Sequence, residues 1–261
     1  MTILTDHRPA RSAIALPARH FYFHMALACA AVAFLGFAPT YFVPLGRGSL
    51  PVTPSMIHVH GIVFFAWSLF FVFQAWLGAS GQIGRHRSVG IVGVSLATAM
   101  TIFGFLAGVI SMQRAAAIGQ KDAGIAFSIV PWSGILFFAV VFAIGIAMVR
   151  RGEVHKRLML LAGISILDAA VARWFLTFLA PPGPPGPPPV SVTVAPALVA
   201  YLLLVAAIVH DWRTRGKPHS VYVVGGIVLV AIKLLNVPVS ETQLWHAFAG
   251  GILALSQSPL I

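Results

Sequence analysis

Residues 125–149 read IAFSIVPWSGILFFAVVFAIGIAMV, which is 25 consecutive positions without a charged side chain. An α-helix rises about 1.5 Å per residue, so about 20 apolar residues cross a hydrocarbon core about 30 Å thick. The stretch therefore predicts a transmembrane helix. The whole chain has the same character, because 59% of its 261 residues are apolar and 9% are charged, against about 25% charged in soluble domains. This composition excludes a soluble globular enzyme, a disordered chain and a nucleic-acid-binding protein.

Six further apolar runs have the length of a membrane span. They cover residues 21–43, 57–80, 88–112, 158–180, 190–209 and 220–238. The sequence thus predicts an all-α, polytopic bundle of seven transmembrane helices over residues 21–238, between an N-terminal segment (1–20) and a C-terminal segment (239–261). Residues 242–256 are too few to span comfortably. We expect an interfacial or re-entrant helix there, with a short eighth span as the alternative.

The basic residues predict the orientation of these helices. The formal net charge is +11, and the N-terminal segment and the second, fourth and sixth connections together hold twelve Lys and Arg, against three in the other connections. Basic connections stay in the cytoplasm and face anionic lipid headgroups. We therefore expect a protein of the bacterial inner membrane with a cytoplasmic N-terminus and a periplasmic C-terminus. Its first partner is then anionic lipid, and nucleic acid is not expected.

Three ionisable residues interrupt the apolar runs, namely Asp168, Arg173 and Lys233. Such groups are costly in a bilayer and mark relays, counter-ions or structural pairs. Asp168 and Lys233 lie at similar depths on different helices, so they can pair if those helices touch. Asp168 and Arg173 are five residues apart on one helix and point about 140° apart. A lysine on the last of seven helices invites a retinal hypothesis, but the third run offers no acidic partner, which argues against it.

The chain also contains ten histidines, some of which are candidate ligands of haem or a metal ion. His24 and His210 have matching depths, as two axial ligands of a b-type haem require. Met56, His58 and His60 would face one side of an extended segment and offer donors suited to copper. In a helix, residues two apart diverge by about 200°, and this set of ligands would separate.

Two short segments resemble a group of bacterial polytopic membrane proteins that carry a domain-of-unknown-function label. In GRHRSVG (84–90), His86, Arg87 and Gly90 match the motif His-Arg-x-x-Gly of that group. In EVHKRLM (153–159), His155, Arg157 and Met159 lie near its motif His-Arg-x-Trp-Met-x-Arg, with Leu158 in place of Trp and Leu161 in place of the last Arg. The resemblance implies an all-helical membrane fold and no established activity.

The same two connections suggest a site for an anion or a lipid headgroup. Short connections make their flanking helices antiparallel neighbours, so His86 and His155 are expected on one face of the bundle. The predicted site comprises these two histidines and four cations: Arg85, Arg87, Lys156 and Arg157.

Three functions remain open from the sequence. The first is a b-type haem-binding or other redox-linked membrane protein that uses interfacial histidines. The second is a small-molecule or proton carrier that uses Asp168, Arg173 and Lys233. The third is a structural or assembly subunit of a homo-oligomer or a larger membrane complex. Gly-rich phosphate loops and the H-E-x-x-H motif are absent from the chain, and whether it is an enzyme stays open.

Overall fold

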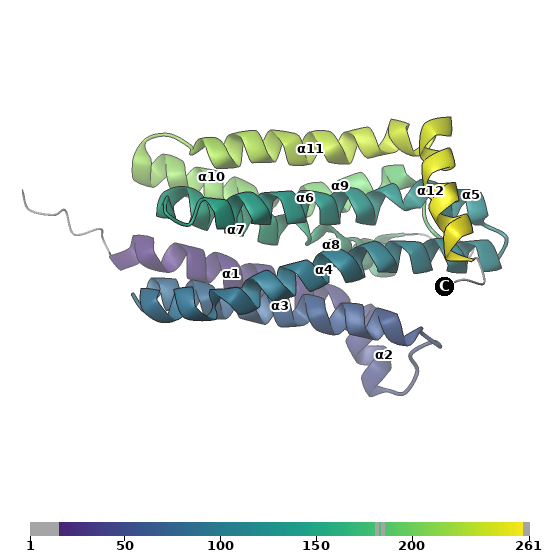
Figure 1. Ribbon diagram of the computed structural model, residues 1–261, viewed down its shortest axis with the longest axis horizontal. Coiled ribbons are helices and arrows are strands. Elements are labelled where there is room, and N and C mark those ends of the chain that lie inside the picture. Colours follow the sequence, from purple (N-terminus) through teal and green to yellow (C-terminus); the bar gives the residue numbers. More distant parts are fainter. Residues whose placement is uncertain (1–15, 181–182, 184–185, 258–261) are drawn as a thin grey trace, which may run out of the picture.

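The computed structural model describes residues 16–180, 183 and 186–257, and this part of the chain is helical and contains no strand. Seven helices in it are long and apolar enough to cross a membrane: His20–Gly46, Ser55–Ala79, Ile83–Ala117, Lys121–Ala147, Gly152–Leu179, Val190–Arg215 and Ser220–Ser240. They run side by side along the long axis of the molecule (Figure 1). The predicted all-α bundle of seven spans is thereby confirmed.

Several spans are built from more than one helical segment. Span one comprises α1 (Leu16–Phe37), a π-helical turn (Ala38–Phe42) and α2 (Val43–Gly46). Spans two and three are the single helices α3 (Ser55–Ala79) and α4 (Ile83–Ala117). Span four joins α5 (Lys121–Phe127) to α6 (Ile129–Ala147).

The later spans continue this pattern. Span five comprises α7 (Gly152–Ser165), α8 (Asp168–Trp174) and a second π-helical turn (Phe175–Leu179). Span six comprises a 3₁₀ turn (Val190–Thr193), α9 (Val194–Ala200) and α10 (Leu202–Arg215), and span seven is α11 (Ser220–Ser240). Consequently only spans two, three and seven are uninterrupted α-helices.

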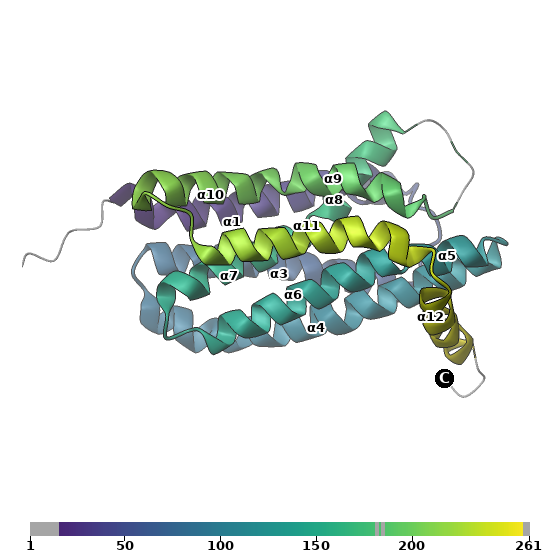
Figure 2. The same cartoon turned by 90° about the horizontal axis from the view of Figure 1, so that it is seen from above.

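An aromatic and aliphatic core joins the spans. Trp67 of α3 makes edge-to-face contacts with Phe138 and Phe142 of α6, at centroid distances of 5.2 and 5.3 Å. Such pairs add about 0.5–1.5 kcal/mol each beyond the apolar area they bury. α11 packs against α6 and α7, whereas α1 and α3 lie on the other side of the bundle (Figures 1 and 2).

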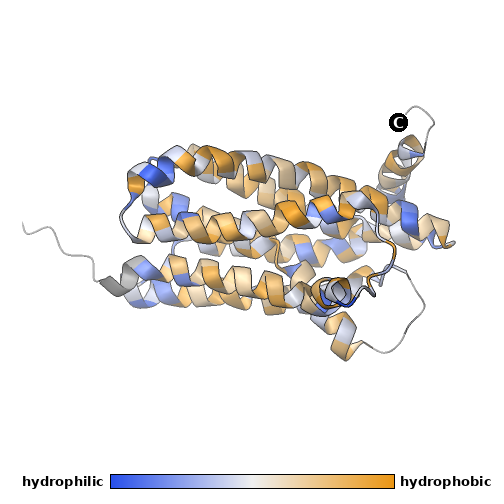
Figure 3. Ribbon diagram, turned by 90° about the horizontal axis from the view of Figure 1, so that it is seen from below, coloured by the Kyte–Doolittle hydropathy of each residue, from blue (hydrophilic) through white to orange (hydrophobic). Residues whose placement is uncertain are grey.

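The two ends of the bundle differ in composition. The end where α1 begins also holds the short connections between spans two and three, four and five, and six and seven, which carry most of the basic residues, and we call it the basic end. Hydrophilic residues gather at the ends of the molecule and apolar ones along its length (Figure 3). The basic residues therefore lie together in space, as the alternation of charge in the sequence predicted.

The last helix, α12 (Gln243–Ser256), lies across the end of the bundle opposite the basic end (Figures 1 and 2). Thr242 is the N-cap of this helix, and its hydroxyl accepts the N–H of Trp245. The Trp245 indole donates to the Ile125 carbonyl at 3.0 Å, and Gln113 of α4 donates to Ser256. This crosswise orientation favours the interfacial interpretation over an eighth span.

Candidate functional site

The fifth span is interrupted near its middle, immediately before Asp168. α7 ends at Ser165 and α8 begins at Asp168, with Ile166 and Leu167 in a turn between them. The Leu167 N–H donates to the Ile164 carbonyl at 3.1 Å, and Asp168 Oδ1 accepts the N–H of Ala169 at 2.8 Å. The break places the carboxylate in the first turn of α8, where free N–H groups favour a negative charge.

Lys233 of α11 reaches this carboxylate from the seventh span. Its Nζ donates to Asp168 Oδ2 at 2.5 Å, and the two side chains are 4% and 16% exposed. The contact joins spans five and seven, which is the pairing expected from the depths of the two residues in the sequence. Because each charge neutralises the other, the pair removes most of the cost of placing either ion in an apolar span.

A small cavity adjoins the ion pair. Its volume is about 10 Å³, close to the least that one water molecule needs. Besides Asp168 and Lys233, its walls include the hydroxyl-bearing residues Ser133, Ser165 and Tyr201. The Tyr201 hydroxyl is buried and has no hydrogen-bond partner among the described residues. The site thus combines two ionised groups, an orphan hydroxyl and room for one water molecule.

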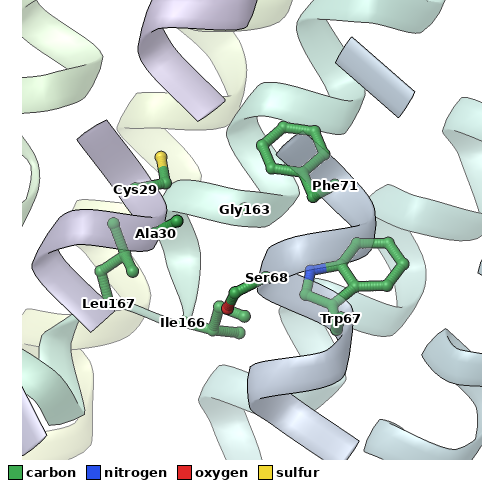
Figure 4. A pocket seen from close by; sticks show the side chains of 8 residues that line it. All are labelled: Cys29, Ala30, Trp67, Ser68, Phe71, Gly163, Ile166 and Leu167. Atoms are coloured by element: carbon green, nitrogen blue, oxygen red, sulfur yellow. The ribbon is translucent and has the colours of Figure 1, made fainter. Parts of the chain in front are cut away.

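A second cavity, also of about 10 Å³, borders the same helix break from the side of α1 and α3. Figure 4 shows its walls, which bring Cys29 of α1 and Trp67 and Phe71 of α3 close to Ile166 and Leu167. The lining is mostly apolar, and the Ser68 hydroxyl within it donates to the Phe64 carbonyl. The break in the fifth span therefore has empty space on two sides.

Arg173 lies apart from the ion pair, although we considered it together with Asp168 and Lys233 as one set of ionisable residues within the apolar runs. Its guanidinium stands over the Phe37 ring at 4.2 Å from the centroid. Its Nε is buried without a partner, and no described carboxylate lies within ion-pair distance of it. The reason is helical geometry, because residues five apart on one helix point in different directions. The structure thus brings together Asp168 and Lys233 only.

A second buried ion pair joins Arg157 of α7 to Asp211 of α10. Arg157 Nε and NH2 donate to the two carboxylate oxygens at 2.8 and 2.5 Å, and NH1 donates to Glu153 Oε2 at 2.6 Å. The Arg157 and Asp211 side chains are 2% and 0% exposed. The rings of Tyr22 and Tyr222 flank the guanidinium, each with its centroid 6.0 Å from Cζ. Two parallel N–H···O bonds of this kind fix the geometry of the pair.

This pair corrects the expectation that Arg157 binds a headgroup. The sixth apolar run ends at residue 209, which predicts that Asp211 lies in a connection, but α10 continues to Arg215 and carries Asp211 into the bundle. Lys156 is also paired, because its Nζ lies 2.7 Å from Glu153 Oε1. Of the six residues of the predicted site, His86 and His155 do lie close together, with ring centroids 6.1 Å apart. Arg85 donates to Gln82, and Arg87 is exposed on the surface.

The residues considered for haem and copper are not gathered into one site. His24 is exposed, whereas His210 stacks on Phe21 with centroids 3.6 Å apart. α3 already begins at Ser55, so all three residues are helical, and His58 points away from the face that Met56 and His60 share. His58 Nδ1 shares a hydrogen bond with the Tyr41 hydroxyl at 2.8 Å, and His60 Nδ1 donates to the Phe103 carbonyl at 3.3 Å.

The copper set thus lacks the extended backbone on which it depended. Within the described ranges, no group of three or more His, Cys, Asp or Glu side chains is arranged to hold a metal ion. A haem held by His24 and His210 stays a prediction, since no described contact joins the two rings.

No protein family, curated protein or solved structure matches this chain in sequence or fold. The resemblance of His86–Gly90 and of the segment around His155 to bacterial membrane proteins therefore stays a prediction.

Proposed function

We propose that this protein is a multi-pass membrane carrier that moves protons, with Asp168 and Lys233 as the groups that bind and release them. The observation that carries the proposal is the buried ion pair at the break in the fifth span, beside a cavity the size of one water molecule. Ionisable groups within membrane spans are expensive, and they mark proton and ion pathways.

The ion pair supplies a chemical means of coupling a proton to a movement. When a proton is added to the Asp168 carboxylate, the attraction to Lys233 is lost and an uncompensated ammonium is left in an apolar span. That state is unfavourable, so protonation favours a conformation in which Lys233 reaches water or loses its own proton. Because Asp168 opens α8 and Lys233 lies on α11, the movement would change how spans five and seven pack.

The broken helix and its two cavities support the same proposal. Non-helical backbone at membrane depth is tolerated where it is buried in protein or lines a cavity, and discontinuous helices form the ion sites of many carriers. The break is bordered by a small cavity on each of two sides, one lined by Ile166 and Leu167 and the other by Ser165 and Asp168. The small volume beside Asp168 favours a proton as cargo over a larger molecule.

The setting of this carrier follows from the charge distribution. We place it in the inner membrane of a bacterium, with its basic end in the cytoplasm and its C-terminus outside, because basic connections are retained on the cytoplasmic side. Anionic lipid headgroups then surround the basic end.

Proton flux into liposomes tests the proposal. Purified protein is reconstituted with a pH-sensitive dye in the lumen, and a potassium gradient with valinomycin sets the membrane potential. We expect flux above that of protein-free liposomes for the wild type and flux at the protein-free level for Asp168→Asn. Asn236→Ala is the matched control, because Asn236 is buried on the same helix as Lys233 and bonds to Ser133 at 2.8 Å, but carries no charge.

The alternative is that the ion pair only ties spans five and seven together. In that case wild-type protein would conduct no more than protein-free liposomes at any imposed potential. Equal flux in the wild type and in folded Asp168→Asn would also contradict the proposal.

A further inference from the structure

Two histidines lie side by side at the basic end, separate from the Asp168–Lys233 pair. His86 is in the first turn of α4 and His155 is in the first turn of α7, so the chain brings them together from different spans. Their ring centroids are 6.1 Å apart and their planes are nearly perpendicular, at 84°. Both side chains are partly buried. The fold therefore positions two imidazoles at one place between four helices.

The hydrogen bonds of the two rings fix which nitrogen carries the proton. His86 Nδ1 lies 3.2 Å from the Gln74 carbonyl oxygen, and His155 Nδ1 lies 2.8 Å from the Gly145 carbonyl oxygen. A carbonyl oxygen only accepts, so each Nδ1 must donate. In a neutral imidazole the lone pair then resides on Nε2. Metal-binding histidines are prepared in this way, with one ring nitrogen held by a backbone carbonyl and the other free to ligate.

This tautomer opposes the binding of an anion between the two rings. An anion needs N–H donors, whereas each neutral ring presents an acceptor at Nε2. Neither Nε2 has a hydrogen-bond partner among the described residues. Two of the nearby cations are already engaged, because Lys156 is held by Glu153 and Arg157 by Asp211 and Glu153, and Arg87 is exposed on the surface. Two Nε2 lone pairs on neighbouring rings favour a cation that accepts electron pairs.

The separation of the rings suits a single metal ion. With a metal–nitrogen distance of about 2.1 Å, the centroids of two imidazoles on one ion lie roughly 5 to 6.5 Å apart, depending on the angle between the bonds. The observed 6.1 Å lies within this range. Because Zn²⁺ usually takes three or four protein ligands, two imidazoles need further donors from other kinds of side chain.

Other donor atoms lie on the helices that surround the histidines. Gln74 is 9% exposed, and both its side-chain Oε1 and Nε2 are buried without a partner. It shares a helix face with Phe71, whose ring contacts Gly163 of α7, so this unpaired amide faces the interior between α3 and α7. Met159, one turn after His155, packs its thioether against Gly145, the residue whose carbonyl holds His155. An amide oxygen and a thioether sulfur complete a donor set of borderline softness.

We propose that His86 and His155 bind a late first-row transition-metal ion, Zn²⁺ or Cu⁺, through their Nε2 atoms. Gln74 and Met159 are the candidate donors for its remaining coordination positions. The iron of a haem bound through the same two nitrogens would use the same chemistry, and the experiment separates these sources. The site is distinct from the proton pathway and would load whether or not the protein carries protons.

Metal titration of the purified full chain in detergent tests this proposal. The probes are Zn²⁺ and Cu⁺, each measured by competition with a coloured chelator, and haemin, measured by its absorbance. We expect one equivalent of Zn²⁺ or Cu⁺ per chain and at least ten-fold weaker binding in His86→Gln and in His155→Gln. For Zn²⁺ and Cu⁺, His24→Gln is the matched control, because His24 is an exposed histidine at the same end and this variant should leave the affinity for the free ions unchanged.

A second measurement needs only wild-type protein and so does not depend on the folding of a variant. Chemical modification of histidine, mapped by mass spectrometry, should be suppressed at His86 and His155 by added Zn²⁺ and unaffected at His24. Absence of stoichiometric binding of all three probes, or equal affinity in both variants, would overturn the proposal. Haemin binding that requires both histidines, without binding of the free ions, would keep the two ligands and identify the metal as haem iron.

Discussion

Among single residues, we expect the buried pair of Arg157 and Asp211 to have the largest effect on the free energy of unfolding. Breaking a fully buried pair leaves one charge uncompensated, which costs about 3–5 kcal/mol. We expect Asp211→Asn to lower the free energy of unfolding by that order, measured by thermal or denaturant unfolding in detergent. Replacing both residues by apolar ones, as in Arg157→Met with Asp211→Leu, should recover most of the loss. Unchanged unfolding of the Asp211→Asn variant would contradict the burial of this pair.

We expect His219 to make the stability of the fold depend on pH. Its Nδ1 accepts the Val221 N–H at 3.2 Å at the start of α11, and its backbone N–H donates to Asp211 Oδ2 at 3.3 Å. Burial, with nearby Arg157 and Arg215, holds the pKa of His219 below its usual 6.5. Because the folded state favours the neutral ring, this contribution to stability is complete above about pH 6.5. It is lost as the pH falls below that value toward the folded-state pKa.

His219→Asn keeps a side chain that caps a helix but does not titrate. We therefore expect the melting temperature of this variant to fall less than that of the wild type between pH 7.5 and 5.5. Identical pH profiles for the two proteins would show that His219 is not protonated on unfolding.

Some contacts of single residues could be predicted from the sequence, and others could not. Depth along two helices was enough to predict the contact of Asp168 with Lys233, because the membrane leaves few other partners for either charge. Asp211 was missed because it follows the apolar run and precedes Arg213, as an exposed helix end would. The pairing of His86 with His155 was expected, but their tautomers depend on carbonyl groups of other helices. No pattern in the sequence specifies such contacts.

At the scale of elements, the close approach of α1 and α8 gives a prediction with an internal control. A Cβ atom built at Gly36 would lie 2.6 Å from Cβ and the carbonyl oxygen of Ala170, whereas one at Gly61 meets nothing within 4 Å. Gly36→Ala should therefore push the helices apart and destabilise the protein by about 1–3 kcal/mol. Gly61→Ala should be neutral or stabilise α3 by up to about 1 kcal/mol. Equal effects on thermal unfolding would contradict the packing of α1 against α8.

The spans were predictable as elements because length and apolar content alone define them. The interruptions within the spans could not be predicted in this way. The break at Ile166 and Leu167 and the π-helical turn Phe175–Leu179 contain neither proline nor glycine, whereas the π-helical turn of span one contains Pro39, a common cause of helix irregularity. These features depend on packing between spans, such as the approach of α8 to α1 and the bond from Asp168 to Lys233.

At the scale of the whole molecule, an odd number of spans places the two termini on opposite sides of the membrane. The basic connections predict that the C-terminus is outside. A reporter enzyme that works only in the periplasm should therefore be active when fused after Ile261, and a cytoplasmic reporter at the same position should be silent. The reverse pattern would require the basic end to face outward.

Proton flux through the double variant Asp168→Asn with Lys233→Gln tests most directly whether the Asp168–Lys233 pair binds and releases the transported proton. Removing both charges leaves no uncompensated ion, so this variant should fold more stably than either single variant. We predict that it reconstitutes into liposomes, unfolds cooperatively like the wild type and carries no more protons than protein-free liposomes. Flux equal to that of the wild type in the folded double variant would show that the Asp168–Lys233 pair is a structural tie and not the proton site.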